Sequence, residues 1–128
     1  MKNTDSLSNN RNFKSVYKNG RSKANRLLVV YICPNGTERN RLGISVSKKV
    51  GNSVVRHRVT RLIRESYRLH EEMLGSGLDI AVIARENARD AAYHEVESAL
   101  LHLARLHGFL KNRKKVEKGT DRFDQALS

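Results

Sequence analysis

Basic side chains that could bind phosphate gather in one short stretch of the chain. Residues 48–68 hold seven Lys or Arg and a single acidic residue, Glu65, whereas residues 69–110 hold three basic and seven acidic residues. The whole protein, 128 residues long, has a formal net charge of +12. Guanidinium groups bind phosphate through paired hydrogen bonds and stack on bases. The uneven charge therefore predicts one basic face that binds a polyanion such as a nucleic acid.

The spacing of these residues places them on one side of a helix expected over residues 53–70. At 100° per residue, an arc of about 60° holds four of them, the basic stripe: His57, Arg61, Arg64 and Arg68. Arg56 and Arg58 flank this stripe. The opposite side, expected to pack on a sheet, carries Val55, Val59, Leu62 and Ser66. Like charges at i, i+4 repel, so the stripe predicts an external anion. A solvated basic face without a partner is the alternative.

Aromatic and basic side chains also meet near the N-terminus, at Phe13, Lys14, Tyr17 and Lys18. They lie in an amphipathic helix expected over residues 9–19, and Tyr31 lies in the following strand. Single-stranded nucleic acid is held by aromatic platforms together with cations. The alternative is that Phe13 and Tyr17 anchor a short helix in the core.

The elements that must position these residues form one small α/β domain. Alternating and β-branched runs predict strands over residues 26–33, 41–47 and 78–84, with a weaker strand over 21–25. A last helix is expected over 91–110. The turn at Pro34-Asn35-Gly36 predicts that strands 26–33 and 41–47 form an antiparallel hairpin. The fold class is therefore α+β, a two-layer α/β sandwich. Residues 1–8 are expected to be disordered, 9–110 to form the domain, and 111–128 to form a basic, frayed tail.

Several classes of protein do not fit the sequence. No apolar stretch approaches the roughly 20 residues that span a bilayer, which excludes a membrane-spanning protein. Cys33 is the single cysteine, which excludes a secreted module held together by disulfides. The polar N-terminus has no secretory signal, so a cytoplasmic location is expected. No histidine or cysteine cluster has zinc-ligand spacing, no phosphate-binding glycine motif occurs, and no DNA-reading motif is present. Carboxylates concentrate away from the basic face, so we expect no metal or other cofactor on protein side chains. Because the sequence has neither an apolar span nor a DNA-reading motif, we also expect no membrane or DNA partner.

The run from Arg41 to Arg68, RLGISVSKKVGNSVVRHRVTRLIRESYR, closely resembles the hallmark of the bacterial ribonuclease P protein component. The resemblance extends over residues 8–110. It includes the opening Phe13-x-x-Val16-Tyr17-x-x-Gly20, the strands VVY at 29–31 and DIAVIAR at 79–85, and the closing helix with Tyr93. It implies the element order αβββαβα with an unusual left-handed βαβ crossover.

The resemblance also implies a function. The holoenzyme is an endoribonuclease, a hydrolase that removes the 5′ leader of precursor tRNA. Its catalytic subunit is an RNA with Mg²⁺ on RNA phosphates, and the protein alone is expected to be inactive. Residues assigned to RNA binding are Lys48, Lys49, Arg56, His57, Arg58, Arg61, Arg64 and Arg68. Those assigned to a cleft for the single-stranded leader are Phe13, Tyr17, Tyr31, Ser45 and Ser47. No catalytic or metal-binding residue is expected.

One position departs from the family pattern. The family usually has arginine, asparagine and arginine where this chain has Arg56, His57 and Arg58. A neutral imidazole offers its donor and acceptor on different ring edges, unlike an amide. Two other functions stay open from the residues alone. One is a structural RNA-binding protein without a part in cleavage, and the other is a free-standing nuclease with His57 as general base.

Overall fold

The computed structural model describes residues 4–7 and 10–110. The α-helices in this part of the chain are α1 (Asn10–Asn19), α2 (Ser53–His70) and α3 (Tyr93–His107). Two short 3-10 helices accompany them, η1 (Glu71–Met73) and η2 (Glu86–Asp90). The strands are β1 (Thr4–Ser6), β2 (Arg21–Ala24), β3 (Leu28–Pro34), β4 (Asn40–Ser45) and β5 (Leu78–Ala84). The predicted α+β class is confirmed, with β1 added before the expected order.

The strands form one mixed sheet in the order β1-β4-β5-β3-β2. Strand β4 is parallel to both β1 and β5, whereas β3 is antiparallel to β5 and β2. Helix α2 connects the parallel neighbours β4 and β5. This βαβ unit is the one to which the expected left-handed crossover applies, and its handedness stays a prediction.

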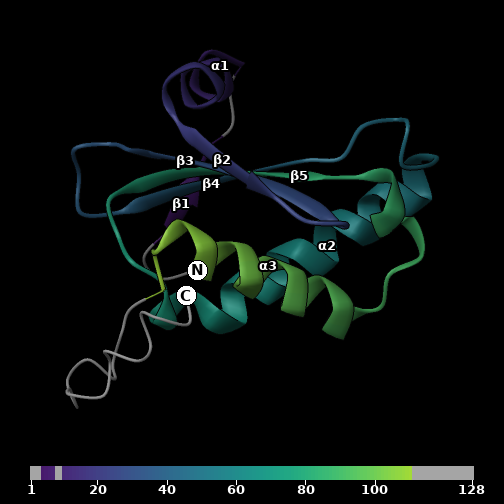
Figure 1. Ribbon diagram of the computed structural model, residues 1–128. Coiled ribbons are helices and arrows are strands. Elements are labelled where there is room, and N and C mark those ends of the chain that lie inside the picture. The colour runs from purple at the N-terminus through teal and green to yellow at the C-terminus, as the bar shows by residue number, and fades with distance from the viewer. Residues whose placement is uncertain (1–3, 8–9, 111–128) are drawn as a thin grey trace.

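The helices cover the two faces of the sheet unequally (Figure 1). Helices α2 and α3 lie side by side on one face, and α1 lies alone on the other. Most buried apolar side chains, including Leu28, Val30 and Ile63, belong to the core between the sheet and the α2–α3 layer. The predicted two-layer sandwich is this sheet with α2 and α3, and α1 adds partial cover opposite.

The expected hairpin between the second and third predicted strands is wrong. Strand β5 lies between β3 and β4, so that Ala81 pairs with Tyr31 on one side and with Gly43 on the other. The side chains of Ile80, Ala81 and Val82 are all 0% exposed. A strand buried on both faces needs neighbours on both sides, and this requirement outweighs the proximity that the short turn provides.

The expected disorder of residues 1–8 is also wrong where the structure describes them, because Thr4–Ser6 form β1. A buried hydrogen-bond chain holds this strand. The Thr4 hydroxyl donates to Glu71 Oε2 over 2.6 Å, so its single proton is used. The Tyr67 hydroxyl therefore donates to Thr4 Oγ1 over 2.9 Å and accepts from Asn40 Nδ2 over 3.1 Å. The expected tail, residues 111–128, lies outside the described residues.

Candidate nucleic-acid interface

Helix α2 presents the basic stripe to solvent, as its periodicity predicts. The Asn52 side chain caps the helix by accepting the backbone N–H of Val55 over 3.0 Å. On the packed side, Val59 and Ile63 are 0% exposed. All four residues of the stripe are exposed: His57, Arg61, Arg64 and Arg68. The buried side is centred nearer Ile63 and Tyr67 than expected, so Val55 and Leu62 are only partly buried.

This shift moves Arg56 toward the sheet. Arg56 is partly buried, and its buried Nε has no hydrogen-bond partner among the described residues. Its side chain lines a hollow of about 390 Å³ between β4 and α2, which we call the basic hollow. The hollow is lined by Ile44, Val46, Ser53, Arg56, His57, Thr60, Arg61 and Arg64. An unpartnered buried N–H beside a cationic hollow favours an anion as its occupant.

Arg58 does not join this hollow. Its guanidinium turns toward the segment before α3, where Nη1 donates to the Arg89 carbonyl over 3.2 Å and Nη2 donates to the Ala91 carbonyl over 2.6 Å. The structure therefore gives Arg58 a role in joining α2 to that segment. Both partners lie more than thirty residues away in sequence, so local spacing could not reveal them.

Arg68, at the far end of the stripe, has an internal partner. Its Nε donates to Glu65 Oε1 over 3.1 Å, and its Nη2 donates to Oε2 over 2.5 Å. The hydrogen bond to Arg68 lowers the pKa of the exposed Glu65 carboxyl. The charge of Arg68 is thus balanced within the protein, whereas Arg61 and Arg64 form no ion pair with any described residue.

The aromatic residues meet on the other face of the sheet. The Tyr17 ring lies edge-on to Tyr31, with centroids 4.9 Å apart, and 6.0 Å from the Phe13 ring. Burial, followed by the neighbouring Tyr31, raises the pKa of the Tyr17 hydroxyl, so this group stays neutral. Beside these rings is a hollow of about 560 Å³, the aromatic hollow, lined by Phe13, Lys14, Tyr17, Ile44 and Ser45.

Gly43 allows α1 to lie this close to the sheet. A Cβ atom added at this position would overlap the Phe13 ring and would also lie 2.8 Å from the Leu7 carbonyl oxygen. The ring therefore rests directly on the backbone of β4. Of the residues expected in the cleft, Phe13, Tyr17 and Ser45 line the hollow, and Tyr31 supports Tyr17.

The two hollows adjoin at Ile44, which lines both. Ser47 and Lys49 line a separate hollow of about 360 Å³ beside the end of β5. Lys48 is exposed in the turn that precedes α2. The structure thus divides the expected site residues into a cationic group on α2, an aromatic group under α1, and a pair beside the end of β5.

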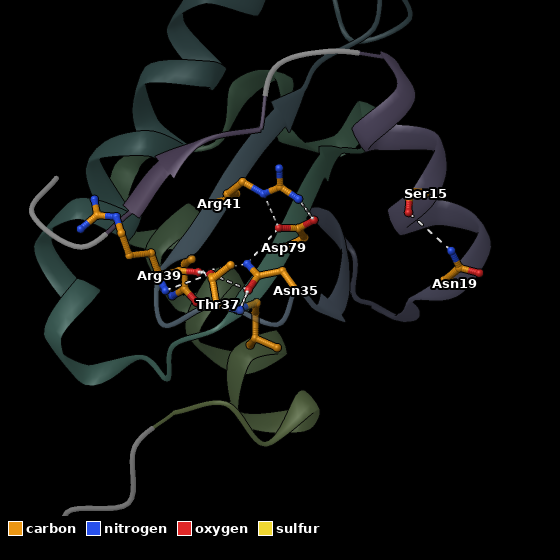
Figure 2. A network of polar contacts seen from close by, with 9 residues as sticks. Ser15, Asn19, Asn35, Thr37, Arg39, Arg41 and Asp79 are labelled. Carbon is orange, nitrogen blue, oxygen red and sulfur yellow. Dashed lines mark hydrogen bonds and ion pairs between the residues drawn. The ribbon is translucent and has the colours of Figure 1, made fainter.

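Sequence reasoning missed a polar network at the β3–β4 loop (Figure 2). Arg41 forms paired hydrogen bonds of 2.7 and 2.6 Å with Asp79, whose carboxylate also accepts from Asn35 over 3.1 Å. Asn35 further contacts Thr37 and the Arg39 carbonyl. Because Arg41 is bound to the buried carboxylate of Asp79, it ties β4 to β5 and its charge is balanced within the protein.

Known proteins resemble this chain along most of its length. The family model described as Ribonuclease P matches residues 1–107. The chain belongs to the ribonuclease P protein family. A ribonuclease P protein component of Lachnoclostridium phytofermentans is 57% identical over 109 residues, covering 85% of this chain and 94% of that one. One from Alkaliphilus metalliredigens is 54% identical, covering 82% and 95%.

Solved structures of the family share the fold. The RNase P protein of Staphylococcus aureus aligns with a TM-score of 0.77 at 38% identity and covers 85% of this chain and 98% of its own. That of Thermotoga maritima aligns with a TM-score of 0.74 at 31% identity and covers 80% and 96%. Family membership places this chain in a ribonuclease system that processes tRNA.

Two further properties concern only residues 4–7 and 10–110. No helix there is long and apolar enough to cross a membrane. No group of three or more His, Cys, Asp or Glu side chains within these ranges could hold a metal ion.

Proposed function

We propose that this chain binds the catalytic RNA of ribonuclease P through α2 and holds the single-stranded 5′ leader of precursor tRNA against α1. The observation that carries the proposal is the junction of the basic and aromatic hollows at Ile44. Cations suit the phosphates of a folded RNA. Stacked rings with neighbouring lysines suit an unpaired strand. One RNA path can therefore pass from one hollow to the other around the edge of β4.

The chemical step in this proposal belongs to the RNA. Phosphodiester hydrolysis needs a positioned base or metal ions at the scissile phosphate. The basic hollow around His57 is lined by no carboxylate among the described residues, which argues against a free-standing nuclease. We assign Mg²⁺ to phosphates of the RNA subunit and the holoenzyme to the cytoplasm. The protein raises affinity for precursor tRNA and has no cleavage activity alone.

The test is cleavage of precursor tRNA by the protein alone, by the catalytic RNA alone, and by both together. We expect no product with the protein alone and more efficient cleavage with both than with RNA alone at low Mg²⁺. Cleavage by the protein alone, abolished in a His57→Ala variant, would support the nuclease. Tight RNA binding without any effect on cleavage would support a purely structural RNA-binding protein.

A further inference from the structure

The short helix α1 has few buried contacts of its own. Among residues 11–19, only Val16 is buried. A helix of ten residues is only marginally stable without tertiary packing, so α1 depends on its neighbours to stay beside the aromatic hollow. The enclosed cluster that includes Val16 holds two further buried side chains, Leu7 and Ala81. Leu7 is the larger of these two and is 2% exposed.

Leu7 belongs to a segment that runs along the edge of the sheet, residues 4–7, which we call the N-terminal clasp. The Leu7 backbone N–H donates to the Leu42 carbonyl over 2.9 Å, which continues the parallel pairing of β1 with β4. Side chains along a strand alternate between the two faces. Thr4 therefore faces the end of α2, whereas Leu7, three residues later, packs on the α1 side.

The clasp is fastened to the end of α2 by a buried side chain. The Thr4 hydroxyl donates to Glu71 and accepts from Tyr67, and all three residues are buried. A buried group that loses its hydrogen-bond partner cannot replace it with water, so these bonds are costly to break. Thr4 thus anchors the clasp to the helix that carries the basic stripe.

The other end of the clasp meets α1 above Gly43. A Cβ atom added at Gly43 would lie 2.8 Å from the Leu7 carbonyl oxygen and would overlap the Phe13 ring. The Leu7 backbone and the Phe13 ring therefore rest side by side on the backbone of β4. Because Phe13 lines the aromatic hollow, a displacement of the clasp would alter the support of that ring.

We propose that the N-terminal clasp positions α1 for the 5′ leader, with Thr4 and Leu7 as positioning residues that do not touch RNA themselves. The inference rests on the proposed function and adds to it a link within the protein, since a buried bond at the end of α2 holds the helix on the opposite face. When the clasp is released, α1 is in place in only a fraction of the molecules, and the apparent affinity for the leader falls by that fraction.

The test compares Thr4→Val, which removes the hydroxyl at nearly constant size, with Leu7→Ala. Thr4→Ser keeps the hydroxyl and should restore wild-type binding. Ser6→Ala is the matched control, because it removes an exposed hydroxyl from the same strand. Affinities of the reconstituted holoenzyme for precursor and mature tRNA are measured, together with the affinity of each protein for the catalytic RNA, and thermal melting verifies folding.

Thr4→Val and Leu7→Ala should each weaken binding of precursor tRNA about threefold to tenfold, as expected if α1 is in place in roughly one third to one tenth of the molecules. Mature tRNA and the catalytic RNA should bind as they do to the wild type, because α2 presents the same cations. Equal losses for both tRNA forms would overturn the inference, since they would make the clasp a general support of the fold.

A double-mutant cycle with Tyr17→Ala provides a second check. If Thr4 acts through α1, Thr4→Val should cost less affinity for precursor tRNA once the Tyr17 ring is absent. Fully additive losses would contradict a route through α1.

Amide hydrogen exchange of the free full-length protein tests the clasp without RNA. Thr4→Val should speed exchange in α1 and leave exchange in the middle of α2 unchanged. Unchanged exchange in α1, or an unchanged affinity for precursor tRNA, overturns the inference alone. A wild-type holoenzyme that binds precursor and mature tRNA equally overturns the proposed leader site as well, so the two failures are distinguishable.

Discussion

The two faces of the sheet carry side chains from the same strands, but one face is closed by packing and the other is partly open. On the face covered by α2 and α3, Leu28, Val30 and Ile80 are 0% exposed. On the face covered by α1, the fully enclosed cluster is small, and Phe13 and Tyr31 are only partly buried. Because strand side chains alternate between faces, one set of backbone segments provides both a closed core and an open binding floor. Changes on the first face should therefore affect folding, and changes on the second should affect RNA.

The largest expected effect is on the closed face. Val59→Asp places a carboxylate at a position that is 0% exposed, where an unpaired charge costs several kcal/mol or takes up a proton. We expect loss of cooperative folding in thermal melts, with RNA binding lost as a consequence. Val54→Asp is the matched control, since Val54 on the same helix is 75% exposed. A stable Val59→Asp protein would contradict the assignment of the faces.

On the open face, Tyr31→Ala removes the ring that supports Tyr17. It should weaken binding of precursor tRNA to the holoenzyme by about 1–3 kcal/mol, the contribution of one base stacked on this aromatic surface. Mature tRNA, which has no leader, should bind as before. The affinity for catalytic RNA should hardly change, because α2 is intact. Tyr31→Phe keeps the ring and serves as control. Equal losses for both tRNA forms, or none, would make Tyr31 a structural residue.

The arginines of α2 allow effects on RNA binding and on folding stability to be compared within one helix. Arg61→Ala and Arg64→Ala should each reduce the salt slope of RNA binding by slightly less than one unit and leave the melting temperature unchanged. Arg68→Ala should do the same to a smaller extent, because Glu65 already pairs with this side chain.

Arg58→Ala should behave in the opposite way. It removes two hydrogen bonds to the Arg89 and Ala91 carbonyls, so we expect a loss of about 1 kcal/mol in folding stability with a nearly normal salt slope. If Arg58→Ala lowers the slope as much as Arg61→Ala does, its guanidinium contacts RNA in the complex.

The smallest expected effect is a pH dependence of the closed core. His107 Nε2 donates to the Val30 carbonyl over 2.7 Å. Burial lowers the pKa of His107, the bond to Val30 opposes this shift, and the nearby Arg21 and Lys23 add to it, so that the pKa is lowered overall. Folding therefore favours the neutral imidazole. Stability should be full above about pH 6.5, the ordinary histidine pKa, and should fall as the pH drops toward the lower pKa of the folded state.

Thermal melts between pH 8 and pH 5 check this expectation. His107→Gln has no titrating ring and can still donate to the Val30 carbonyl, so its decline over this range should be smaller than that of the wild type. Identical curves for the two proteins would show that another group controls acid stability.

The sequence predicted best those features that depend on local periodicity. Helix α2 was expected over residues 53–70, and the structure has it at Ser53–His70, because both faces of an amphipathic helix are encoded within one segment. Strand β1 could not be predicted in the same way. Only Thr4 of its three residues is favoured in strands, whereas Asp5 is disfavoured, and the strand is held by Tyr67 and Glu71, which bond to Thr4 from far along the chain.

In the candidate site, too, local spacing predicted the positions of residues but not their distant contacts. The positions of Arg56, Arg58 and Arg68 on α2 followed from spacing, but the partners of their guanidinium groups did not. Arg58 bonds to carbonyls of another segment, whereas Arg56 lies against the sheet because the buried arc is rotated from the expected one. The separation of Lys49 from the stripe likewise depends on where β5 ends, which is a property of the tertiary fold.

The contact between Phe13 and Gly43 makes the backbone of β4 a spacer that sets the depth of the aromatic hollow. A side chain at position 43 would force the Phe13 ring and the Leu7 backbone to shift, and would thereby change the hollow that Phe13 lines. If this hollow holds an unpaired base of the leader, as we propose, the lack of a side chain at Gly43 helps to set the space for that base. Substitutions of Gly43 should therefore alter the binding that we propose for an unpaired RNA strand in this hollow.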